Sequence, residues 1–427
     1  MEVDVLDRLP TPHGLVRLGV APDHENIKAV SRAFEKTAAR PGFRFFGNVE
    51  VGRDVSHDEL LHMYDAVLYS VGAQTDRRLG IPGEDLPGSW PATAFVAWYN
   101  GHPDFQDLEF DLSQPTAVVV GNGNVAIDCM RMLALTADEL ASTDTIDDAS
   151  AAIAASGIRE LVMLGRRGPV QAAFTPPELK ELGELAGADV IVDPADLELD
   201  PESERELEAD RERVRRNVDL LREFAAALPA GRPRRIVLRF LTSPVAILGT
   251  DRVEGVEVVR NELVLENGRL VARPTGETEV IPAGLVLRSV GYKGVALPGV
   301  PFDESAGVIP NDGGRVEGAE RTYVAGWIKR GPSGVIGTNK KDATETVETL
   351  LADARDGKLQ APGGDLEELL EAKGVRHVEL EGWRAIDEIE RSAGEPLGRP
   401  RVKLRSWSEL LDVGGYSPRS DRDRAPD

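Results

Sequence analysis

The segment TAVVVGNGNVAID, residues 116–128, constrains the fold of this chain most. An apolar run there meets Gly121, Gly123 and Ala126 in a GxGxxA spacing. In a strand, tight turn and helix, the first glycine permits the turn and the second lets backbone N–H groups approach a pyrophosphate, while the small third residue lets the helix pack close to its strand. The sequence therefore predicts a dinucleotide-binding α/β unit here, and the alternative is a purely structural turn.

The following apolar run, ELVMLGRRGP, bears on which dinucleotide is bound. It places Arg166 and Arg167 at the end of a predicted strand, where enzymes that use NAD usually carry an acid. Two guanidinium groups suit the 2′-phosphate of NADP, which a carboxylate would repel. The pair follows the Gly turn by about forty residues instead of about twenty, which we attribute to an inserted segment, Thr136–Ser156. We expect NADP, and the alternative is a solvent-facing arginine pair.

Composition limits the chemistry that the chain can perform. The single Cys129 excludes an intrachain disulfide and a CxxC redox pair, and it cannot ligate an iron–sulfur cluster alone. The six histidines show no metal-ligand spacing, so no metal site is expected. If the protein transfers electrons, a bound organic cofactor must therefore carry them.

Charge and hydropathy narrow the possible partners. A formal net charge of −23 argues against nonspecific nucleic-acid binding and against broad attachment to anionic membranes. The chain has no run of about 18 apolar residues and no secretory signal. We expect no membrane span and a cytoplasmic location.

A length of 427 residues predicts two domains. Strand and helix signals alternate to about residue 113, restart with the Gly turn, and after Gly291 return to the first domain. The expected division is a first domain of residues 1–113 and 292–359, an inserted NADP-binding domain of residues 114–291, a helical appendix at 360–415 and a disordered tail at 416–427. Helices are expected at Asn26–Ala39 and Pro201–Leu228, and strands at Phe43–Val51, Ala66–Val71, Glu160–Leu164, Arg235–Phe240, Val253–Arg260 and Gly284–Val290.

The opening segment EVDVLD suggests a second nucleotide. Its last residue, Asp7, has the character of an acid that binds a ribose at the end of a second Rossmann strand. The strand, Gly-rich turn and helix that should precede this acid are absent, so either this is an ordinary strand or the chain is cut. The segment YDAVLYSVGAQTD favours the cut, because an apolar strand running into Gly72 and Ala73 resembles the closing segment of a dinucleotide-binding half in two-dinucleotide flavoproteins.

Eight segments resemble a known family, and they are LPTPHGLVRLGVAPDH, RFFGNVEVG, GIPGEDLPGS, VVVGNGNVAID, GRRGPVQAAFTPPELKEL, RFLTSPV, LRSVGYKG and AGWIKRGPSGVIGTNKKDA. They resemble the adrenodoxin-reductase-like ferredoxin–NADP reductases, especially the actinobacterial NADPH-ferredoxin reductases, over roughly residues 1–350. The resemblance implies an α/β fold of two Rossmann-like, glutathione-reductase-like domains, the first lacking its opening strand, Gly loop and helix. It also implies FAD and NADP as cofactors and a ferredoxin as partner.

Carried over by position, the resemblance implies two sets of cofactor contacts. Those to FAD are Asp7, Leu15, Val51, Trp327, Gly334, Val335 and Ile336. Those to NADP are Arg77, Asn122, Gly123, Asn124, Val125, Arg166, Arg167, Glu178 and Gly334. Asp7 stands where the family usually has Glu. The glycines near Gly334 would let backbone approach a flat ring, and a helix beginning near Asp342 would aim its positive end there.

His24 and Glu181 lie in matched segments and are candidates for a polar pair near the nicotinamide and the flavin. The alternative for His24 is an ordinary loop histidine. Hydride transfer needs no protein acid, since the cofactors supply the chemistry and the protein supplies alignment.

The leading functional interpretation is an enzyme that passes a hydride from NADPH to FAD and single electrons on to a ferredoxin. One alternative is an NADP(H)-binding protein without flavin or activity, since the flavin-phosphate loop is missing. Another is an NADPH flavoprotein with a different electron acceptor, such as a quinone or a monooxygenase.

Overall fold

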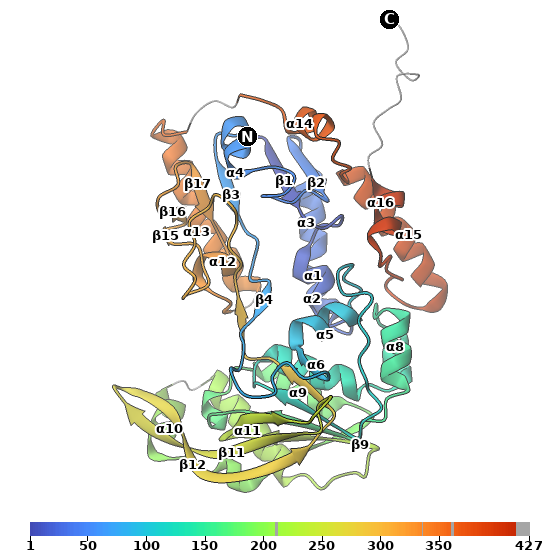
Figure 1. Ribbon diagram of the computed structural model, residues 1–427, viewed down its shortest axis with the longest axis vertical. Helices are drawn as coiled ribbons and strands as arrows, with labels where there is room; N and C mark the ends of the chain where they lie inside the picture. The colour runs from blue at the N-terminus through green and yellow to red at the C-terminus, as the bar shows by residue number, and fades with distance from the viewer. Residues whose placement is uncertain (210–211, 335, 360–362, 416–427) are drawn as a thin grey trace, which may run out of the picture.

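The computed structural model describes residues 1–209, 212–334, 336–359 and 363–415. It consists of two α/β domains and a C-terminal group of helices that contacts both (Figure 1). Among these residues, no helix has the length and apolar character needed to cross a membrane.

Six parallel strands form the sheet of the lower domain in Figure 1, in the order β5-β13-β6-β7-β9-β8. Ala117 and Val119 of β6 face a helical layer, whereas Val118 and Val120 face a second sheet. Because both faces are covered, the strands are apolar throughout. The strand bounds are Ser89–Pro91 (β5), Thr116–Val120 (β6), Glu160–Leu164 (β7), Ala188–Val192 (β8), Arg234–Arg239 (β9) and Leu285–Arg288 (β13).

The helical layer and the second sheet enclose this central sheet. The antiparallel second sheet has the order β10-β11-β12, and two of its strands continue as a long hairpin (Figure 1). Its bounds are Thr242–Leu248 (β10), Gly255–Glu266 (β11) and Arg269–Pro282 (β12). The helices are Ala92–Tyr99 (α5), Asn124–Ala134 (α6), Ala137–Ala141 (α7), Asp147–Ala154 (α8), Pro176–Glu184 (α9), Pro201–Ala209 (α10) and Arg213–Ala226 (α11), with 3-10 turns at Pro169–Gln171 (η1) and Pro194–Leu197 (η2).

The other domain contains two separate sheets. One is the parallel pair β1-β2, and the other has the order β15-β16-β17-β3. Its strands are Val3–Asp7 (β1), Phe43–Gly47 (β2), Val67–Tyr69 (β3), Asn311–Asp312 (β15), Arg315–Val316 (β16) and Thr322–Val324 (β17). Its helices are Gly14–Leu18 (α1), Glu25–Lys28 (α2), Ser31–Ala38 (α3), His57–Met63 (α4), Trp327–Arg330 (α12) and Ile336–Arg355 (α13).

Two chain crossings connect the domains and pair with each other. Thr75–Asp76 (β4) runs antiparallel to Tyr292–Lys293 (β14), and the Arg77 N–H donates to the Gly291 carbonyl. In Figure 1 this short ribbon lies between the two domains. The second domain is therefore an insertion in the first.

The C-terminal helices are Leu366–Ala372 (α14), Leu380–Gly394 (α15) and Trp407–Gly414 (α16), with a 3-10 turn at Glu395–Leu397 (η3). Val378 forms antiparallel bridges with Gly47 at the end of β2 and with Gly415. Trp383 and Ile386 of α15 form a small core with Leu410 of α16.

Several expected elements differ in detail from the structure. Asn26–Ala39, expected as one helix, forms α2 and α3, because Val30 donates back three residues to Ile27. Pro201–Leu228 contains both α10 and α11, and residues 210–211 lie outside the described ranges. The helix expected near Asp342 begins at Ile336.

The expected domain division differs at one boundary. β5 pairs with β13 and α5 packs in the core of the second domain, although both lie within residues 1–113. The remaining bounds stay a prediction, and the tail at 416–427 lies outside the described residues.

Candidate functional site

The predicted nucleotide turn lies between β6 and α6. Gly121 has φ 128°, and a Cβ there would lie 2.1 Å from the carbonyl oxygen of Ser289, so only glycine fits. Gly123 precedes α6, and a Cβ there would meet nothing closer than 4.0 Å. Ala126 is fully buried in the helical core, as close packing of helix on strand requires. At Gly121 the turn therefore has no room for a side chain, whereas the space beside Gly123 is free of protein atoms.

Neighbouring backbone groups fix the rest of this turn. The Asn122 carbonyl accepts hydrogen bonds from the N–H groups of Ala173 and Phe174, and Asn124 Oδ1 accepts one from the N–H of Thr175 at 2.8 Å. Val125 packs partly against the helical core. The segment that leads into α9 is therefore attached to the N-terminus of α6.

Arg166 and Arg167 follow β7 at the carboxyl end of the sheet, beside the nucleotide turn. Their backbone carbonyls accept hydrogen bonds from Asn261 Nδ2 and from the Leu241 N–H. Neither guanidinium has an ion-pair partner among the described residues. Both cations thus remain available for an anion.

His24 and Glu181 meet across the boundary between the domains. Nε2 of His24, the residue that precedes α2, lies 2.7 Å from Oε2 of Glu181 in α9. Burial lowers the pKa of His24, but the hydrogen bond to Glu181 and the charges of Asp128 and Glu178 together outweigh it, and the net pKa is raised. Burial raises the pKa of Glu181, yet His24 and Arg131 bring it below its ordinary value. The contact therefore favours an imidazolium beside a carboxylate.

Sequence reasoning missed three charged members of this cluster. Arg131 of α6 lies 2.5 Å from Glu181, 3.0 Å from Asp23 and 3.1 Å from Asp128. Asp128 and Arg131 are spaced i and i+3 in a helix that is mostly apolar and buried, which is a signal that could have revealed these two residues but not Asp23. One helix therefore carries the nucleotide turn at its start and the charged cluster one and two turns later.

Glu178 lies one turn before Glu181 in α9 and also approaches His24. Its Oε2 lies 3.6 Å from His24 Nε2, is buried, and has no hydrogen-bond partner in the described structure. Burial and the neighbouring Glu181 raise its pKa. An unsatisfied buried acceptor is unusual in proteins, so this oxygen is suited to a donor group of a ligand.

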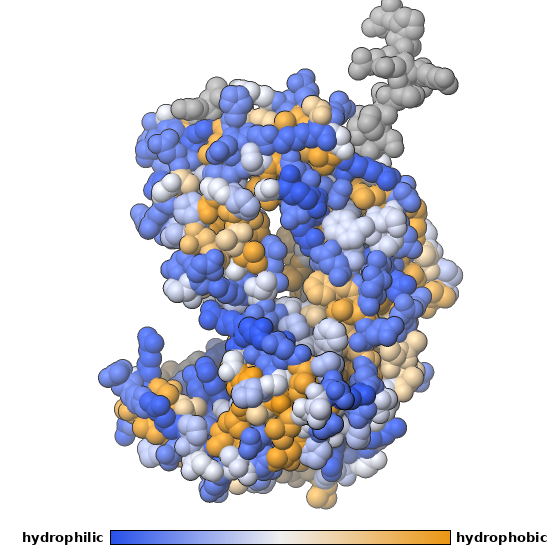
Figure 2. Space-filling view, in the orientation of Figure 1, coloured by the Kyte–Doolittle hydropathy of each residue, from blue (hydrophilic) through white to orange (hydrophobic). Residues whose placement is uncertain are grey.

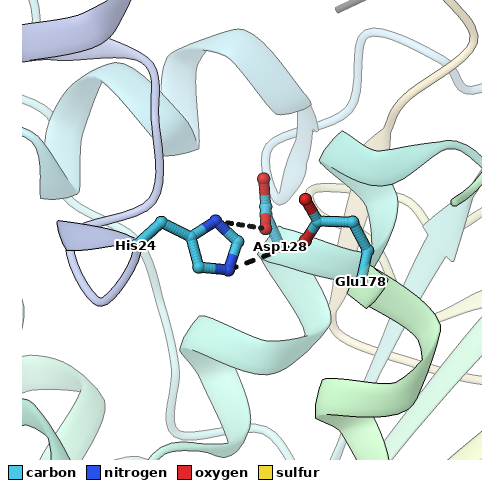
Figure 3. A group of neighbouring side chains, drawn as sticks. All are labelled: His24, Asp128 and Glu178. Atoms are coloured by element: carbon cyan, nitrogen blue, oxygen red, sulfur yellow. Dashed lines mark ion pairs between the residues drawn. The ribbon is translucent and has the colours of Figure 1, made fainter. Parts of the chain in front are cut away.

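His24, Asp128 and Glu178 point toward a common centre (Figure 3). Their candidate ligand atoms lie within 4.8 Å of one another, a spacing that a metal ion could bridge. The guanidinium of Arg131, 3.1 Å from Asp128, already compensates these carboxylates and would repel a cation. The expectation that no metal binds stays a prediction.

Trp327 opens α12 beneath a glycine-rich loop. Its ring stacks on Tyr292 of the interdomain ribbon with centroids 5.5 Å apart, and its buried Nε1 has no hydrogen-bond partner in the described structure. Gly331 and Gly334 have φ values of 89° and 80°, and a Cβ at Gly331 would meet nothing within 4 Å. This loop therefore offers bare backbone beside an unsatisfied indole donor.

Asp342 fixes the position of α12, which leads into this loop. Its carboxylate accepts a hydrogen bond from the Gly326 N–H at 2.5 Å and lies 3.1 Å from Lys329 Nζ. It acts from within α13, which starts at Ile336, while Val335 lies outside the described residues. The start of α13 adjoins the loop, as expected for a helix whose positive end faces an anion.

The remaining predicted flavin contacts are Asp7, Leu15 and Val51. Burial raises the pKa of Asp7 to about 6, although the hydrogen bond from the Leu9 N–H lowers this pKa in part. Leu15 exposes 56% of its surface. Val51 packs partly against two apolar clusters of this domain, one that contains Phe46 and one that contains Tyr69. Figure 2 shows the molecule hollowed between the part with α12 and β17 and the part with α1 to α3.

Arg77, predicted to contact NADP, lies beside the interdomain ribbon. Its Nε donates to the Tyr292 carbonyl at 3.3 Å. Tyr292 is also the residue whose ring stacks on Trp327. Arg77 is thus close to the part of the site where the two domains meet.

A cavity of about 670 Å³ lies at the opposite edge of the nucleotide-domain sheet, where the strands begin. Thr116, Glu160 and Asp189 line it, and it includes none of the predicted site residues. The predicted nucleotide site lies instead at the carboxyl edge, in keeping with the rule that ligands of parallel sheets bind outside the carboxyl ends of the strands.

Comparison with known proteins identifies the family. No family model matches the chain. NADPH-ferredoxin reductase FprA of Mycobacterium tuberculosis is 53% identical over 423 residues, which cover 97% of this chain and 92% of the relative. The mitochondrial NADPH:adrenodoxin oxidoreductase of Arabidopsis thaliana is 40% identical over 433 residues, covering 96% and 89%.

A solved structure shares the fold as well. Mycobacterium tuberculosis FprA in complex with NADPH superposes with a TM-score of 0.93 at 53% identity and covers 97% of this chain and 92% of its own. The predicted fold class and resemblance are confirmed. The chain belongs to the family of NADPH-ferredoxin reductases.

Proposed function

We propose that this protein accepts a hydride from NADPH on bound FAD and passes the electrons singly to a ferredoxin. FAD supplies the exchange between a two-electron donor and a one-electron acceptor. The residues of the chain bind and orient the two dinucleotides and hold a proton beside them.

The NADPH site has three parts in this proposal. Gly123 admits the pyrophosphate to the N-terminus of α6, where N–H groups and the helix dipole favour an anion. Arg166 and Arg167 bind the 2′-phosphate, and the absence of an ion-pair partner for either guanidinium within the described part of the chain supports this role. Glu178 offers its unsatisfied oxygen to a donor group of the nucleotide.

The described residues fit the ring and ribose of a flavin. The orphaned Nε1 of Trp327 and the open space at Gly331 suit a flat ring with acceptor atoms. Asp7, at the end of β1, suits a ribose hydroxyl. Its pKa is about 6, and its carboxyl can donate a hydrogen bond when neutral and accept one when charged. The side chain of Leu15 is exposed and apolar, as a ring contact requires.

His24 and Glu181 have a positioning and proton-holding role. The carboxylate of Glu181 keeps a proton on the imidazole, so the site presents a cation where the two domains meet. A cation at this position favours negative charge on a neighbouring reduced ring. Arg131 holds the same carboxylate oxygen.

The observation that carries the proposal is a single helix, α6, that begins at an open nucleotide turn and ends in a charged cluster shared with the other domain. The test is anaerobic stopped-flow reduction of the FAD-loaded protein by NADPH and by NADH, followed by electron transfer to a ferredoxin. Rapid reduction by NADPH and slow reduction by NADH support it. A chain that binds no FAD, or one reduced equally by both nucleotides, contradicts it.

Replacing the ferredoxin by a quinone in the same experiment tests the alternative acceptor. Faster reoxidation of the flavin by the quinone than by the ferredoxin would favour an NADPH flavoprotein with a different electron acceptor. We place the reaction in the cytoplasm, where a single buried thiol such as Cys129 stays reduced.

A further inference from the structure

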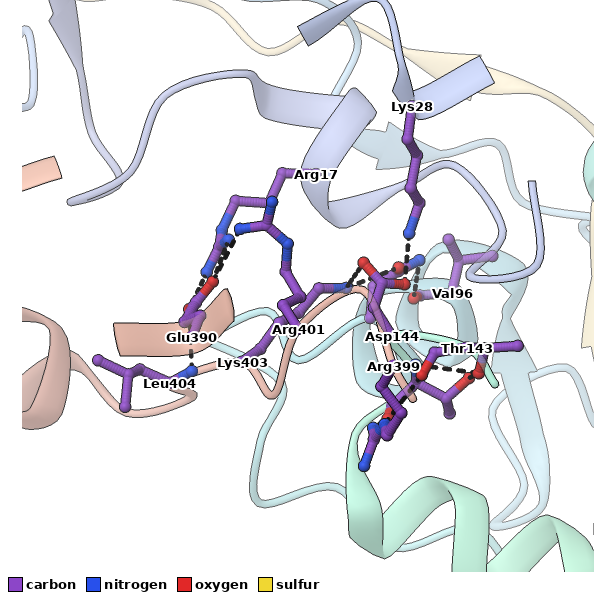
Figure 4. Close-up of polar contacts among 12 residues, drawn as sticks. Arg17, Lys28, Val96, Thr143, Asp144, Glu390, Arg399, Arg401, Lys403 and Leu404 are labelled. Atoms are coloured by element: carbon purple, nitrogen blue, oxygen red, sulfur yellow. Dashed lines mark hydrogen bonds and ion pairs between the residues drawn. The ribbon is translucent and has the colours of Figure 1, made fainter. Parts of the chain in front are cut away.

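Three distant parts of the chain meet in a buried ion cluster (Figure 4). Lys28 of α2 places its Nζ 2.6 Å from Asp144 Oδ1, and Lys403, from the segment before α16, places its Nζ 3.1 Å from Asp144 Oδ2. Their side chains are only 10%, 4% and 0% exposed for Lys28, Asp144 and Lys403. One carboxylate thus joins the first domain, the nucleotide domain and the C-terminal segment.

A second set of contacts attaches the same C-terminal segment to both domains. Glu390 of α15 binds Arg17 of the first domain at 2.5 and 2.7 Å and Arg401 at 3.1 Å. Arg399 donates to the carbonyls of Thr143 and Thr145, on either side of Asp144. The segment therefore braces the loop that presents Asp144.

Charge balance makes the cluster sensitive to loss of any member. Burial alone would raise the pKa of Asp144, but Lys403 and Lys28 hold it well below its ordinary value. Burial lowers the pKa of Lys403 to about 7 against the attraction of Asp144. Removing the carboxylate takes away the charge that favours the protonated form of both buried lysines, and a buried ammonium group without a counter-ion is strongly unfavourable in a low-dielectric interior.

Lys28 is linked directly to the catalytic-site histidine. It is the last residue of α2, and its N–H donates to the His24 carbonyl at 3.1 Å. His24 precedes this four-residue helix, and no side chain caps the helix start. A constraint on Lys28 is therefore a constraint on the turn that presents His24.

We propose that Lys28, Asp144 and Lys403 are positioning residues for the reaction, because they hold the turn of His24 at the distance from α9 that its contact with Glu181 requires. The inference rests on the proposed function. The C-terminal segment is then part of the machinery that aligns the domains.

The variants Asp144→Asn and Lys28→Met test this proposal. Asp144→Asn keeps the shape and removes the charge, whereas Lys28→Met leaves Asp144 paired with Lys403 and so disturbs the interior less. Lys28→Arg retains the cation and should restore most of the lost function. The matched control is Asp148→Asn, because Asp148 pairs with Arg405 between the same two segments but exposes 69% of its side chain.

The first readout does not depend on turnover. NMR titration of histidine-labelled protein gives the pKa of His24, and the spectrum of His24→Gln assigns its resonance. The charged groups around this imidazole are Glu178, Glu181, Asp128, Asp23 and Arg131. In Asp144→Asn and Lys28→Met this pKa should move toward the ordinary value of about 6.5. In Asp148→Asn it should match the unmodified protein.

The second readout is the rate of flavin reduction by NADPH. Misalignment should slow hydride transfer roughly tenfold or more, with the NADPH dissociation constant changed less than about twofold. In a His24→Gln background, the same substitutions should slow the reaction far less, since they act through His24. A purely stabilising cluster would slow both backgrounds by the same factor.

These outcomes separate the two proposals. An unchanged His24 pKa in both Asp144→Asn and Lys28→Met overturns the positioning role, and so does equal slowing in the His24→Gln background. If the unmodified protein does not oxidise NADPH, the proposed function fails, while the His24 titration still decides whether the cluster positions this residue.

Discussion

The imidazole Nε2 of His24 lies 2.7 Å from the carboxylate of Glu181, and the contact joins a turn of the first domain to a helix of the nucleotide domain. Arg131 approaches the same carboxylate oxygen at 2.5 Å. Two cations thus share one acceptor where the domains meet, and the protonation state of the histidine depends on domain geometry.

The pH dependence of the reaction follows from this contact. The pKa of His24 is raised and that of Glu181 is lowered, so the charged pair is complete between about pH 4.5 and 6.5 and is lost as the pH rises through the raised pKa of His24. We expect the rate of flavin reduction by NADPH to fall with increasing pH above about 6.5. In Glu181→Gln the midpoint of this fall should move to lower pH.

The same pair makes a small contribution to stability. Glu181 is partly exposed, so we expect about 1 kcal/mol or less, present below the unfolded pKa of histidine and lost above the folded one. Urea unfolding of the unmodified protein and of Glu181→Gln at several pH values measures it. An identical pH dependence of the unfolding free energy in the two proteins would contradict the assignment.

Nucleotide preference is expected to depend on Arg166 and Arg167. Replacing both by Ala removes charge-assisted hydrogen bonds to the 2′-phosphate, each worth about 1.5 to 3 kcal/mol. The NADPH dissociation constant should rise roughly a hundredfold or more, and that of NADH should change little. Arg235→Ala is the control, because Arg235 lies at the opposite end of the same sheet. An unchanged preference for NADPH would mean that the arginine pair faces solvent only.

Substitution of Gly121 is expected to lower stability, whereas substitution of Gly123 is expected to weaken nucleotide binding. A Cβ at Gly121 would lie 2.1 Å from the Ser289 carbonyl at φ 128°, so Gly121→Ala should lower the free energy of unfolding by about 1 to 3 kcal/mol or more. A Cβ at Gly123 meets open space on the protein side, so Gly123→Ala should fold normally yet weaken NADPH binding by occupying the position of the pyrophosphate. Thermal unfolding and nucleotide titration of both variants check this. Equal loss of stability in the two would contradict it.

The sequence predicted the local units of this fold well and their connections less well. The Gly turn of β6 and α6 is specified within a dozen residues, because strand, glycine and helix signals are adjacent in the chain. The elements β5 and α5 lie within residues 1–113, which were predicted to belong to the first domain, but three strand residues carry no signal of which sheet they join. Membership depends on pairing with β13, almost 200 residues later.

The candidate site shows the same limit. Arg166 and Glu181 lie in segments with recognisable chemistry, whereas Asp23 and Arg131 acquire their role only when a loop of one domain meets a helix of the other. The cluster of Lys28 with Asp144 and Lys403 is still harder to foresee, because its members are separated by more than 100 and more than 250 residues. No local pattern encodes such a contact.

Asp7 provides a test in which stability and binding should move in opposite directions. Burial raises its pKa to about 6, so ionisation destabilises the flavin-free fold as the pH rises from about 4 to about 6. Asp7→Asn keeps the acceptor for the Leu9 N–H and cannot ionise. Without flavin, this variant should be more stable than the unmodified protein by about 1 to 3 kcal/mol at pH 7 and equally stable at pH 4.

Flavin binding should show the cost of that substitution. If the carboxyl of Asp7 binds a ribose hydroxyl, loss of the charge-assisted hydrogen bond should weaken FAD binding by roughly ten- to a hundredfold. Titration of the flavin-free protein with FAD measures the affinity, and urea unfolding on the same samples measures the stability. Greater stability together with weaker flavin binding would show that the acid is retained for its ligand. Unchanged affinity would instead make Asp7 an ordinary end of β1, whose carboxylate accepts the hydrogen bond of the Leu9 N–H.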